Sequence, residues 1–329
     1  MPIKVTVWMI NEEDCMRFIK DLNEGNNISG IYYCKQKVST ETKNGKPYDN
    51  LLLQDKTGII DTKVWEPYSP GIGEYEAGDF IEVYGDIIVF NNAKQAKLTR
   101  IRKADEGDYN PGDYFPVTQK NIDEMYGKVK EYIASIENPY LKKLLEMQFI
   151  EDEEFVALFK KVSAAKTVHH GFIGGLLEHT LSVTNLCNFF CTAYPVLNRD
   201  LLLSAALCHD IAKTKELSAF PDNDYTDDGQ LLGHIVMGVE MIGEKINKID
   251  GFPAKLAGEL KHCILAHHGE YEYGSPKKPA IAEAVALNFA DNTDAKMETL
   301  TELFASTDNR DWLGFNRLLD SNVRKTSIS

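Results

Sequence analysis

The sequence has little of what secreted and membrane proteins need. Its six cysteines are scattered over 329 residues with no Cys-x-x-Cys pair, which argues against a disulfide framework and predicts a reduced, cytoplasmic protein. No run of about 18 apolar residues is present, so we expect no membrane span. The N-terminal stretch meets acidic residues by residue 12 and lacks a signal-peptide cleavage pattern. We therefore expect no membrane partner.

Basic residues are also scarce, since 36 Lys and Arg stand against 50 Asp and Glu and give a net charge of −14. Sequence-independent phosphate binding needs clustered Lys and Arg, so this balance excludes a polybasic coat for nucleic acid. It leaves open an enzyme that binds phosphates through metal ions. The 43% of hydrophobic and 26% of charged residues are typical of a folded globular protein. A chain of this length exceeds one ordinary core, which predicts two domains.

The N-terminal half contains no histidine at all. All eight histidines lie between His169 and His268. Uniform placement would give this clustering with a chance on the order of 10⁻⁴. Histidines gathered in this way indicate a metal site in the C-terminal half of the chain.

Residues 28–104 show the pattern of a small β-domain. Asn44-Gly45 is the strongest short signal for a hairpin, and Gly85 interrupts a strand where we expect a bulge or a bend. Five short strands separated by turn residues predict a small closed barrel, of which the OB-fold is the commonest example. We assign this OB-fold domain to residues 1–104.

Residues 105–116 are rich in Asp, Gly, Pro and Tyr and form the predicted linker. After it, apolar residues recur at spacings of three and four, which indicates amphipathic helices and an all-α domain over residues 117–315. Residues 316–329 have the composition of a polar tail. The predicted helices cover residues 121–136, 139–150, 152–162, 176–194, 199–217, 231–249, 254–268 and 280–304.

Histidines and aspartates recur inside the apolar stretches of these helices. A lone histidine on an apolar face is more often a hydrogen-bonded core residue than a ligand. Several such residues from five helices, among them the adjacent pair His209-Asp210, can instead satisfy one another on a divalent cation. Imidazole and carboxylate suit manganese, iron, zinc and similar ions, and the ligand types do not choose among them. The residues are His169-His170, His179, His209-Asp210, His234, His267-His268 and Asp291.

The order His…His-Asp…Asp, carried by His179, His209-Asp210 and Asp291, resembles the HD superfamily of metal-dependent phosphohydrolases. HDIAK at 209–213 and the ADNTDA run around Asp291 are typical of that superfamily. A barrel followed by such a domain, with HHGFIGGLLEHT at 169–180, resembles the YhaM-type 3′→5′ exoribonucleases. The resemblance covers residues from about 13 to about 315.

The resemblance implies two divalent ions per chain, Mn²⁺ first, with Co²⁺, Fe²⁺, Mg²⁺ and Zn²⁺ as alternatives. The carboxylate of Asp210 would be shared between the ions and would serve in catalysis. Two adjacent cations lower the pKa of a water between them and neutralise phosphate oxygens. The implied first site is His179, His209, Asp210 and Asp291, and the second adds His234, His267 and His268 to Asp210.

Two further residues are predicted to act in catalysis. Lys213 lies one helical turn beyond the His209-Asp210 pair and on the same face, where it could contact a phosphate, the alternative being a solvated surface lysine. His169 and His170 precede a glycine-rich segment whose backbone can approach a ligand closely. In the resembled family this segment lies beside the site, so we assign to His170 a phosphate contact or an acid role. The alternative is that the two histidines cap the loop.

The predicted barrel would bind single strands by stacking bases on aromatic side chains over a positively charged groove. Alternation along strands places about half of the barrel's aromatic residues inside it. Acidic residues lie between the lysines, so binding should be weak and steeply dependent on salt. The residues that we assign to this surface are Tyr48, Trp65, Lys46 and Lys63.

These features predict a metal-dependent 3′→5′ exoribonuclease that degrades single-stranded RNA, with single-stranded DNA as a second candidate substrate. The barrel would deliver the strand and the helical domain would cut it. One alternative is an HD-type nucleotide or cyclic-nucleotide phosphohydrolase, although the HDxGYP signature of cyclic di-GMP enzymes is absent. Another is a non-catalytic single-strand-binding protein. A homo-oligomer is compatible with all three of these functions.

Overall fold

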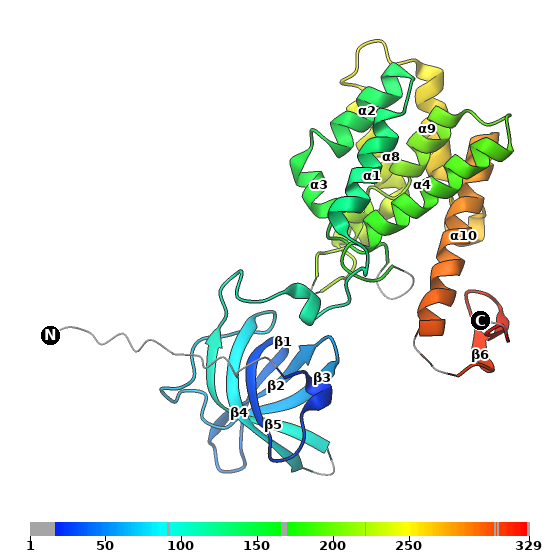
Figure 1. Cartoon of the computed structure of the whole chain (residues 1–329). Coiled ribbons are helices and arrows are strands. Elements are labelled where there is room, and N and C mark those ends of the chain that lie inside the picture. Colours follow the sequence, from blue (N-terminus) through cyan, green and yellow to red (C-terminus); the bar gives the residue numbers. More distant parts are fainter. Residues whose placement is uncertain are drawn as a thin grey trace. The chain divides into compact units, whose positions relative to one another are not determined.

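A computed structural model of the protein describes residues 17–90, 93–165, 170–220, 222–305, 307 and 309–327. The chain divides into two compact units, Met1–Pro116 and Val117–Ser329. The first is a β-barrel and the second is mostly helical (Figure 1). The predicted fold class, a small all-β barrel followed by an all-α domain, is confirmed.

The first unit is a closed five-stranded barrel of the OB type, in which the strands follow the order β1-β2-β3-β5-β4. Strands β3 and β5 pair in parallel, and the other neighbours are antiparallel. The strands are β1 (Asn27–Glu41), β2 (Pro47–Asp55), β3 (Gly58–Val64), β4 (Phe80–Phe90) and β5 (Ala93–Lys103), preceded by the short 3₁₀ helix η1 (Ile19–Asp21).

Local sequence explains the barrel. Along β2, buried and partly exposed residues alternate, so Leu51 and Leu53 fill the interior. The predicted hairpin at Asn44-Gly45 joins β1 to β2, and Gly45 has a φ of 72°. The register of β4 against β5 shifts at Gly85, where a Cβ atom would lie 2.1 Å from the carbonyl oxygen of Lys97. The predicted irregularity at Gly85 is therefore required by close strand approach.

The segment predicted as a linker packs on the barrel through its aromatic residues. Tyr109 stacks on Phe80 with ring centroids 3.7 Å apart. Tyr114 and Phe115 are buried, and the ring of Phe115 meets that of Tyr33 edge-on at 5.1 Å. Residues 105–116, which include the 3₁₀ helix η2 (Pro111–Asp113), thus belong to the first unit.

The second unit is built on the long buried helices α4 and α5, which pack against each other and against α10. Asparagine or aspartate side chains cap the first turns of α1, α2, α3 and α5, as expected where helices follow such residues. The helices are α1 (Ile122–Ala134), α2 (Pro139–Phe149), α3 (Glu153–Phe159), α4 (Gly175–Ala193), α5 (Arg199–Cys208), α6 (Lys213–Glu216), α7 (Asp227–Leu231), α8 (Gly233–Ile246), α9 (Ala254–Ala266), η3 (Tyr271–Tyr273) and α10 (Ala282–Ala305).

The helix predicted over residues 199–217 is wrong in one respect, because it breaks after Cys208. The amides of Lys213 and Thr214 bond to the carbonyls three residues earlier, at 3.0 and 3.3 Å, which tightens the chain into turns before α6. His209 and Asp210 therefore lie in a turn at the end of α5. The break directs this pair into the middle of the helical unit.

The segment 316–329, described above as a polar tail, contains the second strand of a hairpin. Strands β6 (Trp312–Asn316) and β7 (Ser321–Arg324) pair antiparallel after the end of α10. Asp311 pairs with Arg324 at 3.1 Å, and Asp320 adopts a φ of 47° at the turn. Among the described residues, no helix is long and apolar enough to cross a membrane.

Candidate metal centre

The helical unit brings together the side chains of all seven residues predicted as metal ligands. They come from five separate helical segments, and most of them are buried. His179 lies on α4, His209 and Asp210 follow α5, His234 lies in the first turn of α8, His267 and His268 follow α9, and Asp291 lies on α10.

One group of ligand atoms surrounds Nε2 of His179. This nitrogen lies 3.1 Å from Nε2 of His209, 3.2 Å from Oδ1 of Asp291 and 3.5 Å from Oδ2 of Asp210. Oδ2 of Asp210 is also 3.5 Å from Nε2 of His209. The four side chains therefore face one small volume.

A second group lies on the other oxygen of the same aspartate. Oδ1 of Asp210 is 3.4 Å from Nε2 of His234 and 3.7 Å from Nε2 of His267. The ring of His268 completes the group, with its centroid 4.3 Å from that of His267. The Asp210 carboxylate thus presents one oxygen to each group, which is the arrangement of a bridging ligand.

Three buried atoms at this meeting point have no hydrogen-bond partner, namely Oδ1 of Asp210, Nε2 of His234 and Nε2 of His267. Leaving such atoms unsatisfied costs about 1–3 kcal/mol each, and more for a charged group. A divalent cation coordinated by these atoms removes that cost. The donor set, imidazole nitrogen and carboxylate oxygen, fits such an ion.

Hydrogen bonds at the far side of each ring fix the tautomers. Every one of the five rings has Nδ1 beside an acceptor, so Nδ1 carries a proton and Nε2 is the nitrogen left to bind a metal ion. The five contacts are His179 to Asp294 Oδ2 (2.7 Å), His209 to Ala206 O (2.7 Å), His234 to Glu216 Oε1 (2.8 Å), His267 to Ile264 O (2.7 Å) and His268 to Tyr273 O (2.9 Å).

The electrostatics of the centre suit ligands that are ready to bind. Burial lowers the pKa of His209, His267 and His268, which leaves these rings neutral at pH 7. Burial alone would raise the pKa of Asp210, but the charge of Lys213 and the hydrogen bond with His179 outweigh it and hold that pKa well below its usual range. Asp210 is therefore an ionised carboxylate.

Around His179 the charge balance demands a cation. Burial alone would lower the pKa of His179, but hydrogen bonds with Asp210, Asp291 and Asp294 raise it well above its usual value. Three carboxylates hold positive charge at this place, carried by a proton or by a metal ion. Because a ligating imidazole must be neutral, a metal ion bound here would displace a proton from His179.

Comparisons with known proteins agree with this geometry. The HD domain family matches residues 176–296, which contain all seven predicted ligands, and it implies dependence on divalent metal. The chain is 36% identical over 277 residues to the 3′-5′ exoribonuclease YhaM of Geobacillus sp. (strain WCH70), covering 84% of each chain. It is 33% identical to that of Bacillus subtilis (strain 168), over 84% of this chain and 87% of the relative.

The chain belongs to the YhaM family of HD-domain proteins. A third relative, the 3′-5′ exoribonuclease YhaM of Bacillus velezensis, is 34% identical over 83% of this chain and 86% of its own. The resemblance stated from the sequence is thereby confirmed. The role of each single residue as a ligand stays a prediction.

In this YhaM-family chain, sequence reasoning missed the residues that orient the ligands. Asp294 accepts hydrogen bonds from His179, from His170 at 3.0 Å and from the hydroxyl of Ser182. Glu216 accepts from both the ring and the backbone amide of His234, at 2.8 and 3.0 Å. Asp294 follows Asp291 by three residues and so shares its helix face, a signal that could have found it. Nothing comparable marked Glu216.

His170 lies at the edge of the centre, where its Nε2 meets Asp294. It is buried and has a φ of 57°. The next turn requires glycine, since Gly174 has a φ of 82° and a Cβ atom at Gly175 would lie 2.0 Å from the carbonyl oxygen of His170. The sequence predicted that glycine here lets the backbone approach a ligand. In the structure, Gly175 lets the backbone approach the carbonyl of His170 in the same loop. His169 lies outside the described residues.

Lys213 is partly buried at the centre, with 15% of its side chain exposed, which argues against the alternative of a solvated surface lysine. Its Nζ donates to the carbonyl of Ala164 at 2.7 Å and lies 3.7 Å from Oδ2 of Asp210. Burial alone would lower the pKa of Lys213, but Asp210 and Glu216 raise it, so the ammonium stays charged. The predicted phosphate contact of Lys213 stays a prediction.

In the barrel unit the structure brings three of the four predicted RNA contacts together. Tyr48 and Trp65 stack with centroids 4.9 Å apart, and Trp65 is 40% exposed. Lys46 and Trp65 line a pocket of about 250 Å³ together with the exposed Tyr68. Lys63 does not line that pocket, and its ammonium bonds to Asn50 and pairs with Asp61 at 3.3 Å.

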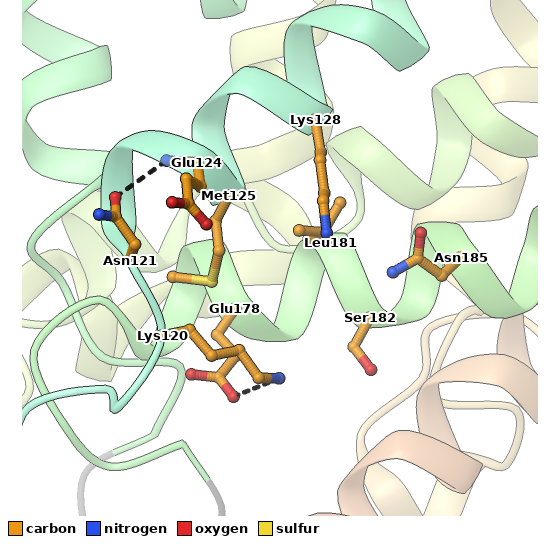
Figure 2. Close-up of a pocket in the computed structure, with 9 residues that line it drawn as sticks. All are labelled: Lys120, Asn121, Glu124, Met125, Lys128, Glu178, Leu181, Ser182 and Asn185. Carbon is orange, nitrogen blue, oxygen red and sulfur yellow. Dashed lines mark hydrogen bonds and ion pairs between the residues drawn. The ribbon is translucent and has the colours of Figure 1, made fainter.

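A second pocket, of about 320 Å³, opens between the start of α1 and one face of α4 (Figure 2). Lys120 pairs with Glu178 at 2.7 Å across it. Ser182, which donates to Asp294, lines the same pocket, so its wall continues into the support of the metal centre. The lining residues are Lys120, Asn121, Glu124, Met125, Lys128, Glu178, Leu181, Ser182 and Asn185.

Proposed function

We propose that the chain is a metal-dependent 3′→5′ exoribonuclease that shortens single-stranded RNA, with single-stranded DNA as a second substrate. The observation that carries the proposal is the convergence of two groups of ligand atoms on the two oxygens of Asp210. The named activity of relatives that match more than four fifths of the chain supports the reaction and the RNA substrate.

The first ion would be held by the group around His179 and the second by the group around His234, with Asp210 shared. Two ions per chain are proposed, with Mn²⁺ as the first choice and Co²⁺, Fe²⁺, Mg²⁺ or Zn²⁺ as alternatives. Bound divalent ions supply an activated water and neutralise the charge of the scissile phosphate. The remaining ligands are His209, His267, His268 and Asp291.

The chain's own residues would position the RNA. The charged ammonium of Lys213, 3.7 Å from Asp210, is placed to receive a phosphate oxygen of a strand bound at the centre. His170 is held beside the same centre by Asp294 and is assigned a phosphate contact or an acid role. The barrel would deliver the strand through Tyr48, Trp65 and Lys46.

We place this activity in the cytoplasm, on the ground of the scattered cysteine pattern, five members of which are free thiols. A homo-oligomer remains part of the proposal as one mode of assembly. Neither point affects the chemistry at the metal centre.

The test is incubation of the full chain with 5′-labelled single-stranded RNA and Mn²⁺, with and without a chelator, beside Asp210→Asn. We expect stepwise shortening from the 3′ end, stopped by the chelator and absent in the variant. Hydrolysis of mononucleotides alone would favour a nucleotide phosphohydrolase instead. A mobility shift without cleavage would favour a binding protein.

A further inference from the structure

The loop between α9 and α10 carries two tyrosines that reach into solvent beside the metal centre. Tyr271 and Tyr273, on the 3₁₀ helix η3, are 62% and 68% exposed. Single exposed rings are common on protein surfaces, but two on one three-residue helix offer a combined aromatic surface to a ligand. Neither residue has a role in the helical core.

This loop is fixed in place from both of its ends. Gly269 has a φ of 80°, and a Cβ atom there would lie 2.5 Å from the side chain of Asn288, which itself donates to the carbonyl of His267 at 2.7 Å. The buried hydroxyl of Ser275 contacts the carbonyls of Leu265 and Lys277 at 3.0 and 2.8 Å. The backbone that presents the tyrosines is therefore preorganised, so binding through them costs little conformational entropy.

The same loop touches a predicted ligand of the second ion. The carbonyl oxygen of Tyr273 accepts the hydrogen bond from Nδ1 of His268 at 2.9 Å. The ring of Tyr271 has the ammonium of Lys278 5.6 Å from its centroid, and Lys278 pairs with Glu270 at 2.5 Å. Two exposed rings thus lie on the loop next to His268, one of them beside a lysine that is paired with Glu270.

We infer that Tyr271 and Tyr273 form a stacking platform for the bases at the 3′ end of a single-stranded RNA whose phosphodiester lies at the metal centre. The inference rests on the proposed function and adds to it the residues that hold the terminal bases. Stacking on an aromatic ring tolerates every base, because each has a π-face, and it is worth about 1–3 kcal/mol per base. A platform of this kind suits an enzyme that removes nucleotides without regard to sequence.

The test asks whether the two tyrosines act through the bases at the 3′ end of the RNA. Two RNA oligomers are compared, one normal and one whose two 3′-terminal residues lack bases, with the full-length wild type and with Tyr271→Ala, Tyr273→Ala and Tyr273→Phe. We expect removal of both bases to lower kcat/KM of the wild type about 100-fold, about tenfold for each base that loses its stacking contact. Each alanine variant, which keeps one ring, should lose about tenfold on normal RNA and only about tenfold more when both bases are removed. Tyr273→Phe, which keeps the ring, should behave as the wild type.

Tyr194→Ala is the matched control, since Tyr194 is also exposed but ends α4 fifteen residues beyond His179, roughly 22 Å along the helix. Tyr273→Ala keeps the backbone carbonyl that orients His268, so its affinity for Mn²⁺ and its melting temperature should match those of the wild type. An alanine variant that loses the same factor as the wild type on removal of the bases would overturn the inference alone. A wild type that shortens neither RNA would overturn the proposed function, and the inference with it.

Discussion

At the scale of single residues, the centre depends on which nitrogen of each imidazole carries the proton. Carbonyl oxygens set this for His209, His267 and His268, and carboxylates set it for His179 and His234. The ligand residues themselves could be predicted from sequence, because polar side chains inside apolar helices need a common partner. The residues that orient these ligands, Asp294 and Glu216, could not be predicted. In the sequence nothing distinguishes them from surface acids, and only the fold places each beside a histidine.

Replacing Asp294 by asparagine tests this support. The carboxylate accepts three hydrogen bonds, whereas an amide offers one oxygen and turns its NH₂ group toward at least one donor. We expect Asp294→Asn to weaken Mn²⁺ binding by about 10–100-fold, as measured by calorimetry. Ser182→Ala, which removes only one of the three donors, should change the affinity by less than about threefold. Equal affinities of Asp294→Asn and the wild type would show that Asp294 does not orient the centre.

At the scale of elements, spacing predicted where helices lie but not how they end. The eight predicted segments correspond to α1, α2, α3, α4, the pair α5 and α6, α8, α9 and α10, while the short α7 was not foreseen. The break at His209 follows from turn hydrogen bonds that periodicity does not encode. The β6–β7 hairpin is too short for an alternating pattern to stand out from a polar tail.

The start of α3 gives a pH-dependent test at this scale. Asp152 caps the helix through the amide of Phe155 at 3.1 Å and pairs with Lys245 of α8 at 2.8 Å. Burial alone would raise the pKa of Asp152, but the bonds from Lys245 and Phe155 outweigh it and lower that pKa. A carboxyl with a lowered pKa stabilises the fold above its unfolded value, about 3.9, and this stability is lost as the pH falls through the folded pKa.

Asp152→Asn keeps the cap and removes only the ion pair, because asparagine is an equally good capping residue. At pH 7 we expect it to lower the free energy of unfolding by up to about 1 kcal/mol, since the pair is partly exposed. That deficit should shrink toward zero as the pH falls below the unfolded value through the lowered pKa of Asp152, because the wild-type carboxylate then becomes protonated. Asp152→Ala should lose about 1 kcal/mol more both at pH 7 and at acidic pH. Urea unfolding of the three proteins measures these free energies. A loss of stability in Asp152→Asn that grows on acidification would contradict the account.

At the scale of the whole molecule, the sequence placed binding and chemistry in different units, and the structure has a barrel unit and a helical unit. The spacing of apolar residues predicted both units, because alternation indicates strands whereas spacings of three and four indicate helices. It did not foresee that the aromatic residues of 105–116 pack on the barrel, because packing partners far apart in sequence carry no local signal. The net charge of −14 leaves the barrel's few cations and rings as the expected contacts for RNA.

Trp65→Ala in the full chain tests the role of the barrel. Loss of one stacking ring should raise the Kd for a 20-nucleotide single strand about tenfold, as measured by fluorescence anisotropy with the active site blocked by chelator. Hydrolysis of a dinucleotide, which has no bases beyond those at the scissile bond, should keep its rate. A variant that binds the long strand as tightly as the wild type would remove Trp65 from the binding surface.

The central claim is that five helical segments direct their imidazole and carboxylate groups at one shared pair of cations. Elemental analysis of the full chain, purified without chelator and dialysed against Mn²⁺, tests it most directly. The account predicts two equivalents of metal per chain, bridged by Asp210, and a loss of both in Asp210→Asn. A wild type that retains no metal above the dialysis background would contradict it.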